Sequence, residues 1–122
     1  MKKLSLIVLF SLLFGGLYAQ KKVLIEDYKG VVEAAKTALD ESMKAPDGSL
    51  WLFATKHQIS GTFELTITIH EKGKVLTVFV KKNDGGSIKS QNMLKDFLME
   101  QKFNFKMPKG NDYKFDHSFQ FN

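Results

Sequence analysis

Histidine has the widest chemical repertoire in this sequence, because imidazole serves both as a metal ligand and as a general acid or base. The chain holds three, His57, His70 and His117. A metal site needs three or four converging ligands, which often include a closely spaced pair such as His-x-x-x-His. No such pair occurs, and in an extended strand Asp116 points to the face opposite His117. The sequence therefore predicts no metal site and no cofactor, and His117 is expected to be partly buried and hydrogen-bonded.

Nucleophilic catalysis needs an activated serine or cysteine beside a base. Cysteine is absent, and Ser49 and Ser60 sit in ordinary glycine-containing turns rather than in a Gly-x-Ser-x-Gly elbow. The glycine-rich stretch 83–87 lacks the Gly-Lys-Ser pattern of a phosphate-binding loop. The neighbouring carboxylates at 26–27 and 40–41 point to different sides of a helix and are typical of a solvated surface. We therefore expect a protein that is not an enzyme.

Charge and composition argue against a nucleic-acid partner. The formal net charge is +5, and all 18 basic residues are lysine. Proteins that bind nucleic acids rely on arginine for bidentate contacts with bases and phosphates. The lysines are instead expected to form a solvated face with some affinity for acidic surfaces.

Two stretches have helical periodicity. Apolar residues three or four apart over 21–45 predict a helix that the turn residues 46–49 end. A second helix is predicted over 90–102, with Ser87 or Ser90 as its cap. One face of this helix is apolar and comprises Ile88, Met93, Leu94, Phe97 and Leu98. Residues 50–54 form an apolar run that fits either a short strand or a segment lying across the core.

Strict alternation of apolar and polar residues predicts three strands. Residues 62–70 and 75–82 form a hairpin around the turn at 71–74. The last strand, 113–121, has one aromatic face and one polar face, and the aromatic face comprises Tyr113, Phe115, His117, Phe119 and Phe121. The predicted fold class is α+β: a two-layer sandwich in the order helix, optional short strand, β-hairpin, helix and strand, with two helices covering a small antiparallel sheet.

The first 19 residues have the features of a cleavable signal peptide. A positive start is followed by the apolar stretch 4–14, two glycines and a small residue, Ala19, at the cleavage position. A retained membrane anchor is the alternative, but 4–19 is shorter than the roughly 20 apolar residues that span a bilayer. We expect residues 20–122 to be one periplasmic or secreted domain without a transmembrane anchor after cleavage.

Four sequence features occur in a fixed order from His57 to Phe121. They are the entry Ile59-Ser60-Gly61-Thr62, the x-x-Gly-x-Val turn ending at Val75, the Phe-x-Phe-Lys-x-Pro exit at 103–108, and a closing Phe-Gln-Phe. In this order they resemble the C-terminal domain of the energy-transducing protein TonB. The chain departs from that family in having only two prolines, hence no Pro-rich spacer, and in residues 20–56, which do not match. The resemblance therefore implies the fold and a role in binding a protein partner, rather than a role in energy transduction.

The resemblance also implies a sheet order of 2-1-3, in which the last strand lies at an edge. The unpaired backbone groups of an edge strand are a template for an incoming extended peptide. The candidate partner-binding residues lie on the polar face of that strand: Lys114, Asp116, Ser118 and Gln120. The alternative is that this strand only closes the core.

Aromatic residues provide a second candidate surface. The chain has 11 phenylalanines and one tryptophan, more than a three-stranded sheet needs. They either build the core or leave a patch around Trp51 and Phe53 that docks a partner or an apolar ligand. The expected function is that of an exported protein-interaction module with a protein partner in the cell envelope. An accessory or inhibitory subunit of another exported protein and a small carrier of an apolar ligand are the alternatives.

Overall fold

Three helices and three strands make up the part of the chain that the computed structural model describes, which is residue 25 and residues 27–122. The predicted signal peptide lies outside these residues. In chain order the elements are α2 (Tyr28–Ser42), α3 (Ser49–His57), β1 (Gly61–His70), β2 (Val75–Asp84), α4 (Ile88–Met99) and β3 (Asp112–Phe121). Within the described residues, no helix is both long and apolar enough to cross a membrane.

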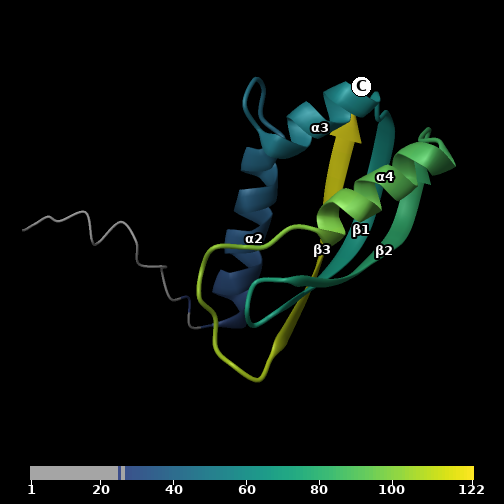
Figure 1. The fold of residues 1–122 in the computed structure, drawn as a ribbon. Coiled ribbons are helices and arrows are strands. Elements are labelled where there is room, and N and C mark those ends of the chain that lie inside the picture. The colour runs from purple at the N-terminus through teal and green to yellow at the C-terminus, as the bar shows by residue number, and fades with distance from the viewer. Residues whose placement is uncertain (1–24, 26) are drawn as a thin grey trace, which may run out of the picture.

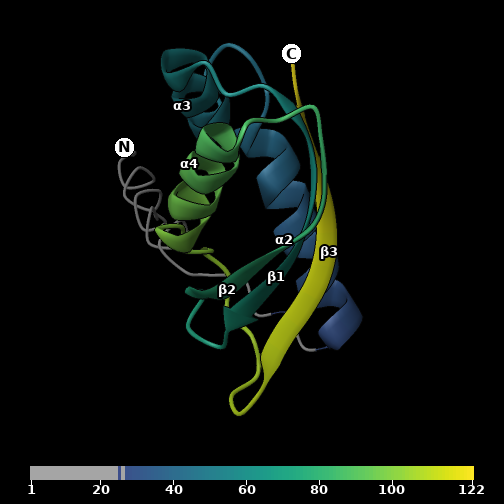
Figure 2. The same cartoon turned by 90° about the vertical axis from the view of Figure 1, so that its right-hand side faces the viewer.

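The sheet is antiparallel and has the order β2-β1-β3. β1 lies in the centre, and β3 pairs with it without a register shift from Gly61↔Phe121 to His70↔Asp112. α3 and α4 lie over one face of the sheet, and α2 runs beside the edge strand β3 (Figures 1 and 2). The α+β two-layer architecture is therefore confirmed, with three helices where two were predicted. The strand order is the one that the TonB resemblance implied.

The core lies between the helices and the inner face of the sheet. Every second residue of β1 is buried there, as the predicted alternation requires. β3 contributes Tyr113, Phe115, Phe119 and Phe121, and the helices contribute Val31, Ala35, Leu39, Leu50, Ala54, Leu94 and Leu98. In the described residues, six aromatic side chains are buried in this core and Phe53, Phe97 and Phe105 pack against it, so most of the aromatic content there is explained as core.

The apolar run 50–54 is part of a helix, α3, which packs on the core, so of the two alternatives the short strand was wrong. Leu50 and Ala54, four residues apart, are buried on one helical face. Leu52 lies between them and is 51% exposed. The exposed Leu52 is itself apolar, so the run 50–54 looks uniformly apolar in the sequence. The helical pattern continues through the polar residues 55–57.

The two predicted helices have different bounds from those expected. α2 begins at Tyr28 because the Asp27 side chain caps it, accepting a hydrogen bond of 3.0 Å from the Gly30 N–H. Ser87 caps α4 in the same way, which confirms one of the two predicted caps, and α4 ends at Met99 rather than at 102. Ile88 is 66% exposed, so its placement on the inner face was wrong.

The β1–β2 turn is fixed to the segment that follows α4. Gly73 has φ +88°, and a Cβ on it would collide with the Phe103 carbonyl oxygen, so only glycine fits here. The Gly73 carbonyl accepts a hydrogen bond of 2.8 Å from the Phe103 N–H, and Lys74 forms a β-bridge with Lys102. The turn and the 102–109 segment therefore form one surface at the end of the molecule opposite α3 (Figure 1).

Candidate functional site

The outer edge of β3 is closed at one point by a tyrosine. The Tyr28 hydroxyl, at the start of α2, accepts a hydrogen bond of 2.8 Å from the Lys114 N–H and donates one of 3.0 Å to the Lys114 carbonyl. One side chain thus satisfies the two groups that a neighbouring strand would satisfy. Its ring packs against Tyr113 at a centroid distance of 5.1 Å.

This contact establishes which backbone groups of β3 face outward. In an antiparallel strand, alternate residues direct their N–H and C=O groups to opposite sides. Because those of Lys114 face Tyr28 rather than β1, those of Asp116, Ser118 and Gln120 also face the outer edge. Within the described part of the chain, no backbone or side-chain group is hydrogen-bonded to these three residues on that side. The backbone groups on this edge are therefore unpaired from Asp116 to Gln120, and α2 runs beside the strand (Figure 1).

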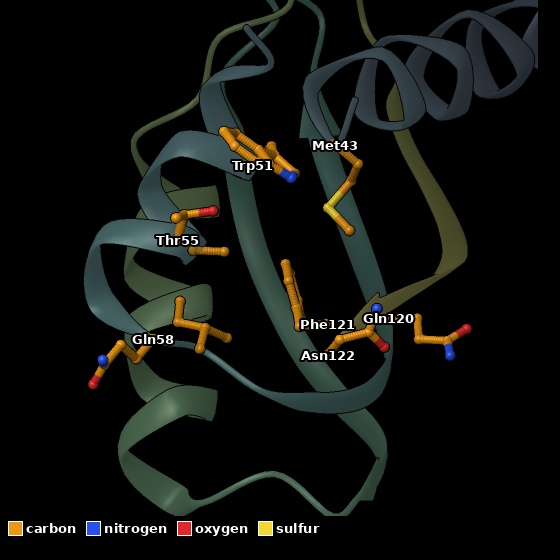
Figure 3. Close-up of a pocket in the computed structure, with 9 residues that line it drawn as sticks. Met43, Trp51, Thr55, Gln58, Gln120, Phe121 and Asn122 are labelled. Atoms are coloured by element: carbon orange, nitrogen blue, oxygen red, sulfur yellow. The ribbon is translucent and has the colours of Figure 1, made fainter. Parts of the chain in front are cut away.

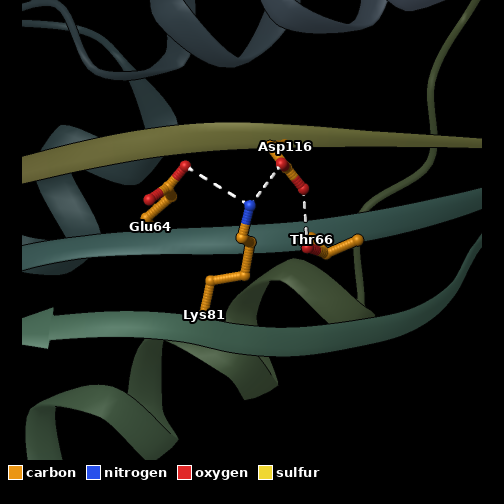
Figure 4. A network of polar contacts seen from close by, with 4 residues as sticks. All are labelled: Glu64, Thr66, Lys81 and Asp116. Atoms are coloured by element: carbon orange, nitrogen blue, oxygen red, sulfur yellow. Dashed lines mark hydrogen bonds and ion pairs between the residues drawn. The ribbon is translucent and has the colours of Figure 1, made fainter.

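The side chains of the four predicted partner-binding residues all lie on the open face of the sheet, opposite the helices, and all four residues are exposed. Asp116 is engaged there: it accepts hydrogen bonds of 2.8 Å from Lys81 Nζ and 2.6 Å from Thr66 Oγ1 (Figure 4). Lys81 also lies 3.9 Å from Glu64. The hydrogen bonds from Lys81 and Thr66 lower the pKa of Asp116, and the same bond raises the pKa of Lys81. Asp116 thus holds β2 and β3 together across β1, whereas the side chains of Ser118 and Gln120 have no such role.

A groove of about 570 Å³ lies at the end of β3, between that strand and α3 (Figure 3). We call it the Trp51 groove. Its lining residues are Met43, Trp51, Ala54, Thr55, Gln58, Ile59, Gln120, Phe121 and Asn122. The groove begins where α2 ends, so the residues at the end of β3 belong to both the open edge and the groove.

The structure separates the two predicted aromatic candidates. Trp51 lines the groove and is half-buried. Phe53 lies on another side of α3 and packs against Phe97, at a centroid distance of 4.7 Å, and against His57. Trp51 and Gln120, candidates from distant parts of the sequence, are brought together, and Phe53 is part of the packing between α3 and α4.

Gln58, on the groove wall, has a backbone conformation that is unusual for its residue type. It ends α3 in the left-handed region at φ 55°, a position that glycine or asparagine usually occupies. Helices commonly end on one residue in this conformation, and here the Ile59 N–H donates a hydrogen bond of 3.0 Å to the Ala54 carbonyl. No pattern in the sequence predicts this conformation, because glutamine has no preference for it.

His117 has a structural role. Its side chain is 10% exposed, and Nε2 lies 2.9 Å from Asp40 Oδ1 on α2, which joins α2 to the inner face of β3. This agrees with the expectation of a partly buried, hydrogen-bonded histidine. In the described ranges, no group of His, Asp and Glu side chains has the arrangement of a metal site.

The open face carries one aromatic side chain that sequence reasoning did not place there. Phe79 on β2 is 65% exposed and lines a shallow hollow with Lys81, Lys114 and three threonines, Thr66, Thr68 and Thr77. A register shift between Glu64 and Leu65 changes the pairing with β2, so the alternation of β2 is irregular. Around Phe79 itself the pairing is continuous, but its neighbours Val78 and Val80 are apolar as well, so the sequence does not show which face Phe79 occupies.

With this geometry established, the chain was compared with protein-family models, with curated proteins and with solved structures, and none of them matches it.

Proposed function

We propose that this protein is a non-enzymatic binding module that takes up an extended segment of a protein partner as a fourth strand beside β3. The observation that carries the proposal is the row of outward backbone groups from Asp116 to Gln120, which have no partner in the described part of the chain. Exposed sheet edges bind extended peptides through these groups, and pockets beside them select side chains. We further propose that the protein is exported and meets its partner in the cell envelope, since its first 19 residues have the pattern of a signal peptide.

The Trp51 groove supplies the selecting pocket in this proposal. Side chains alternate between the two faces of a strand, and directly paired residues project to the same face. A partner residue paired with Phe121 therefore projects to the helix side, where the groove lies. Met43 and Trp51 offer it apolar contacts, so the partner should place an apolar residue at this position. The partner residues paired with Ser118 and Gln120 project to the open face and should be polar.

A carrier of an apolar ligand is supported less well by the same groove. Its volume would hold a small ligand, but its wall includes the exposed residues Thr55, Gln58, Gln120 and Asn122. Ligand pockets bury most of the ligand surface. A groove with an exposed polar rim suits one side chain of a bound peptide better.

An inhibitory or accessory subunit would use the same edge and differ only in its partner.

The test is a proline at an outward position. The binding assay uses a peptide selected from a displayed library of short random sequences for binding to the parent domain. Ser118→Pro removes an N–H that faces the edge and is not used in pairing with β1, so the domain should stay folded. It should bind the selected peptide at least tenfold more weakly. Ser118→Ala keeps the N–H and should bind like the parent, and His117→Pro removes an inward N–H and should unfold the domain. Folding is followed by circular dichroism and binding by calorimetry.

Two results would overturn the proposal. One is full binding by a folded Ser118→Pro variant, which would show that the edge is not used. The other is a selected peptide that leaves the amide exchange of Asp116, Ser118 and Gln120 unchanged. Since Trp51 is the only tryptophan, its fluorescence reports separately whether a side chain enters the groove.

A further inference from the structure

At the end of the molecule opposite the Trp51 groove, a second hollow combines positive charge with apolar surface. It has a volume of about 520 Å³, and four lysines line it: Lys72, Lys102, Lys106 and Lys109. Phe105, Met107 and Pro108 provide the apolar part of its wall. We call it the lysine groove.

The lysines of this groove are not neutralised by the protein. In the described residues, none of the four forms an ion pair with a carboxylate, whereas Lys44, Lys81 and Lys82 do. Glu71 is the one carboxylate in the lining, and it accepts a hydrogen bond from the Gly110 N–H. Bringing like charges together costs free energy that an anion bound among them would recover.

Hydrogen bonds and a β-bridge join the segments that form this groove to each other and to the rest of the domain. The bond from Phe103 to Gly73 and the bridge between Lys74 and Lys102 join its two segments. The Tyr113 hydroxyl donates to the Pro108 carbonyl at 3.2 Å. The Ile25 N–H donates to the Lys106 carbonyl at 2.9 Å, so the chain enters the described domain beside this groove.

We infer that the lysine groove docks this end of the protein on a membrane surface rich in anionic phospholipid. A lipid phosphate fits the lysines by charge, and the carbon atoms next to it fit the wall formed by Phe105, Met107 and Pro108. Before the predicted cleavage, the apolar stretch 4–14 precedes Ile25 in the chain, so export would bring the domain to a membrane by the end that carries these lysines. Clusters of lysines at a membrane surface bind anionic headgroups in this way, and the binding is screened by salt.

The test is co-sedimentation with lipid vesicles. The protein is purified after export from the cells that produce it, so that its N-terminus is the natural one. The parent should sediment with phosphatidylglycerol-containing vesicles at low salt, should be released at high salt, and should not bind phosphatidylcholine vesicles. Lys102→Gln, Lys106→Gln and Lys109→Gln combined should weaken binding about a hundredfold, since each lysine contributes roughly a fivefold factor. The control combines Lys56→Gln, Lys89→Gln and Lys95→Gln, which removes the same charge from α3 and α4 and should leave binding within about threefold of the parent. Both variants carry the same N-terminus, so their difference reports on the groove.

Three results would overturn the inference. Equal weakening by both triple variants would show that net charge alone acts. Release from vesicles by inorganic phosphate at constant ionic strength would show a site for a free anion rather than for a lipid surface. Saturable binding of a soluble acidic peptide, with none to vesicles, would assign the groove to a protein partner. Circular dichroism of each variant confirms that the fold is kept.

Discussion

At the scale of single residues, Tyr28 has the clearest effect on the proposed function, because its hydroxyl occupies the edge of β3 where a longer peptide would pair. Tyr28→Phe keeps the ring packed on Tyr113 and frees the N–H and C=O of Lys114. We expect a loss of about 1 kcal/mol in unfolding free energy, since the freed groups are exposed and water replaces the hydroxyl. Peptides that extend past Asp116 should bind more tightly to this variant. Unchanged affinity for both short and long peptides would contradict this role.

Asp116 gives a prediction about pH. Its hydrogen bonds from Lys81 and Thr66 lower its pKa in the folded state from an ordinary value near 3.8. A group whose folded pKa is lowered stabilises the fold above its unfolded pKa, and this contribution is lost as the pH falls through the folded pKa. Titration of the Asp116 carboxyl by NMR should therefore give a lower midpoint in the parent than in Lys81→Gln. Identical midpoints would show that the two side chains do not pair in solution.

At the scale of elements, α4 tests how well periodicity identifies a buried face. The sequence placed both Phe97 and Ile88 on that face, but only Phe97 packs there, against Phe53. Phe97→Ala should lower the unfolding free energy by about 2 kcal/mol, less than the 3–5 kcal/mol typical of a fully buried phenylalanine, because Phe97 is half-buried. Ile88→Ala is the matched control and should change it by less than about 0.5 kcal/mol. Chemical denaturation measures both. Equal losses would mean that the first turn of α4 is packed in solution.

The elements that sequence reasoning predicted well are those with an uninterrupted period. β1 and β3 alternate without fault and pair in a continuous register, and the two longer helices have full apolar stripes. α3 was missed because nine residues give too few turns to distinguish a helix from a buried strand. β2 was predicted as a strand, but Phe79 stands between two apolar residues, Val78 and Val80, so alternation did not reveal its exposure.

The candidate site was predictable only in part, for a related reason. The residues on the polar face of β3 follow from alternation alone. That Trp51 and Gln120 line the same groove, and that Tyr28 closes the edge at Lys114, depends on contacts between residues far apart in the chain. No local pattern encodes such contacts. The lysine groove likewise forms only when the β1–β2 turn meets the segment after α4.

At the scale of the whole molecule, the two proposed surfaces lie at opposite ends of the sheet. β3 runs from the lysine end to the Trp51 groove (Figure 2), and a ten-residue strand spans roughly 30 Å. A protein docked on a membrane through its lysines would therefore hold the partner-binding end of β3 away from the membrane.

The N-terminus decides whether this arrangement relies on the lysines alone. We predict that the mature protein begins near Gln20, because a short positive start, an apolar stretch and Ala19 form a cleavage pattern. Mass spectrometry of the exported protein measures this directly, and intact residues 1–19 in a membrane fraction would contradict it. A retained leader would also hold the domain by its lysine end, because Ile25 is bonded to Lys106. Substituting the groove lysines would then leave the protein on the membrane, whereas in the cleaved form the same substitutions should release it.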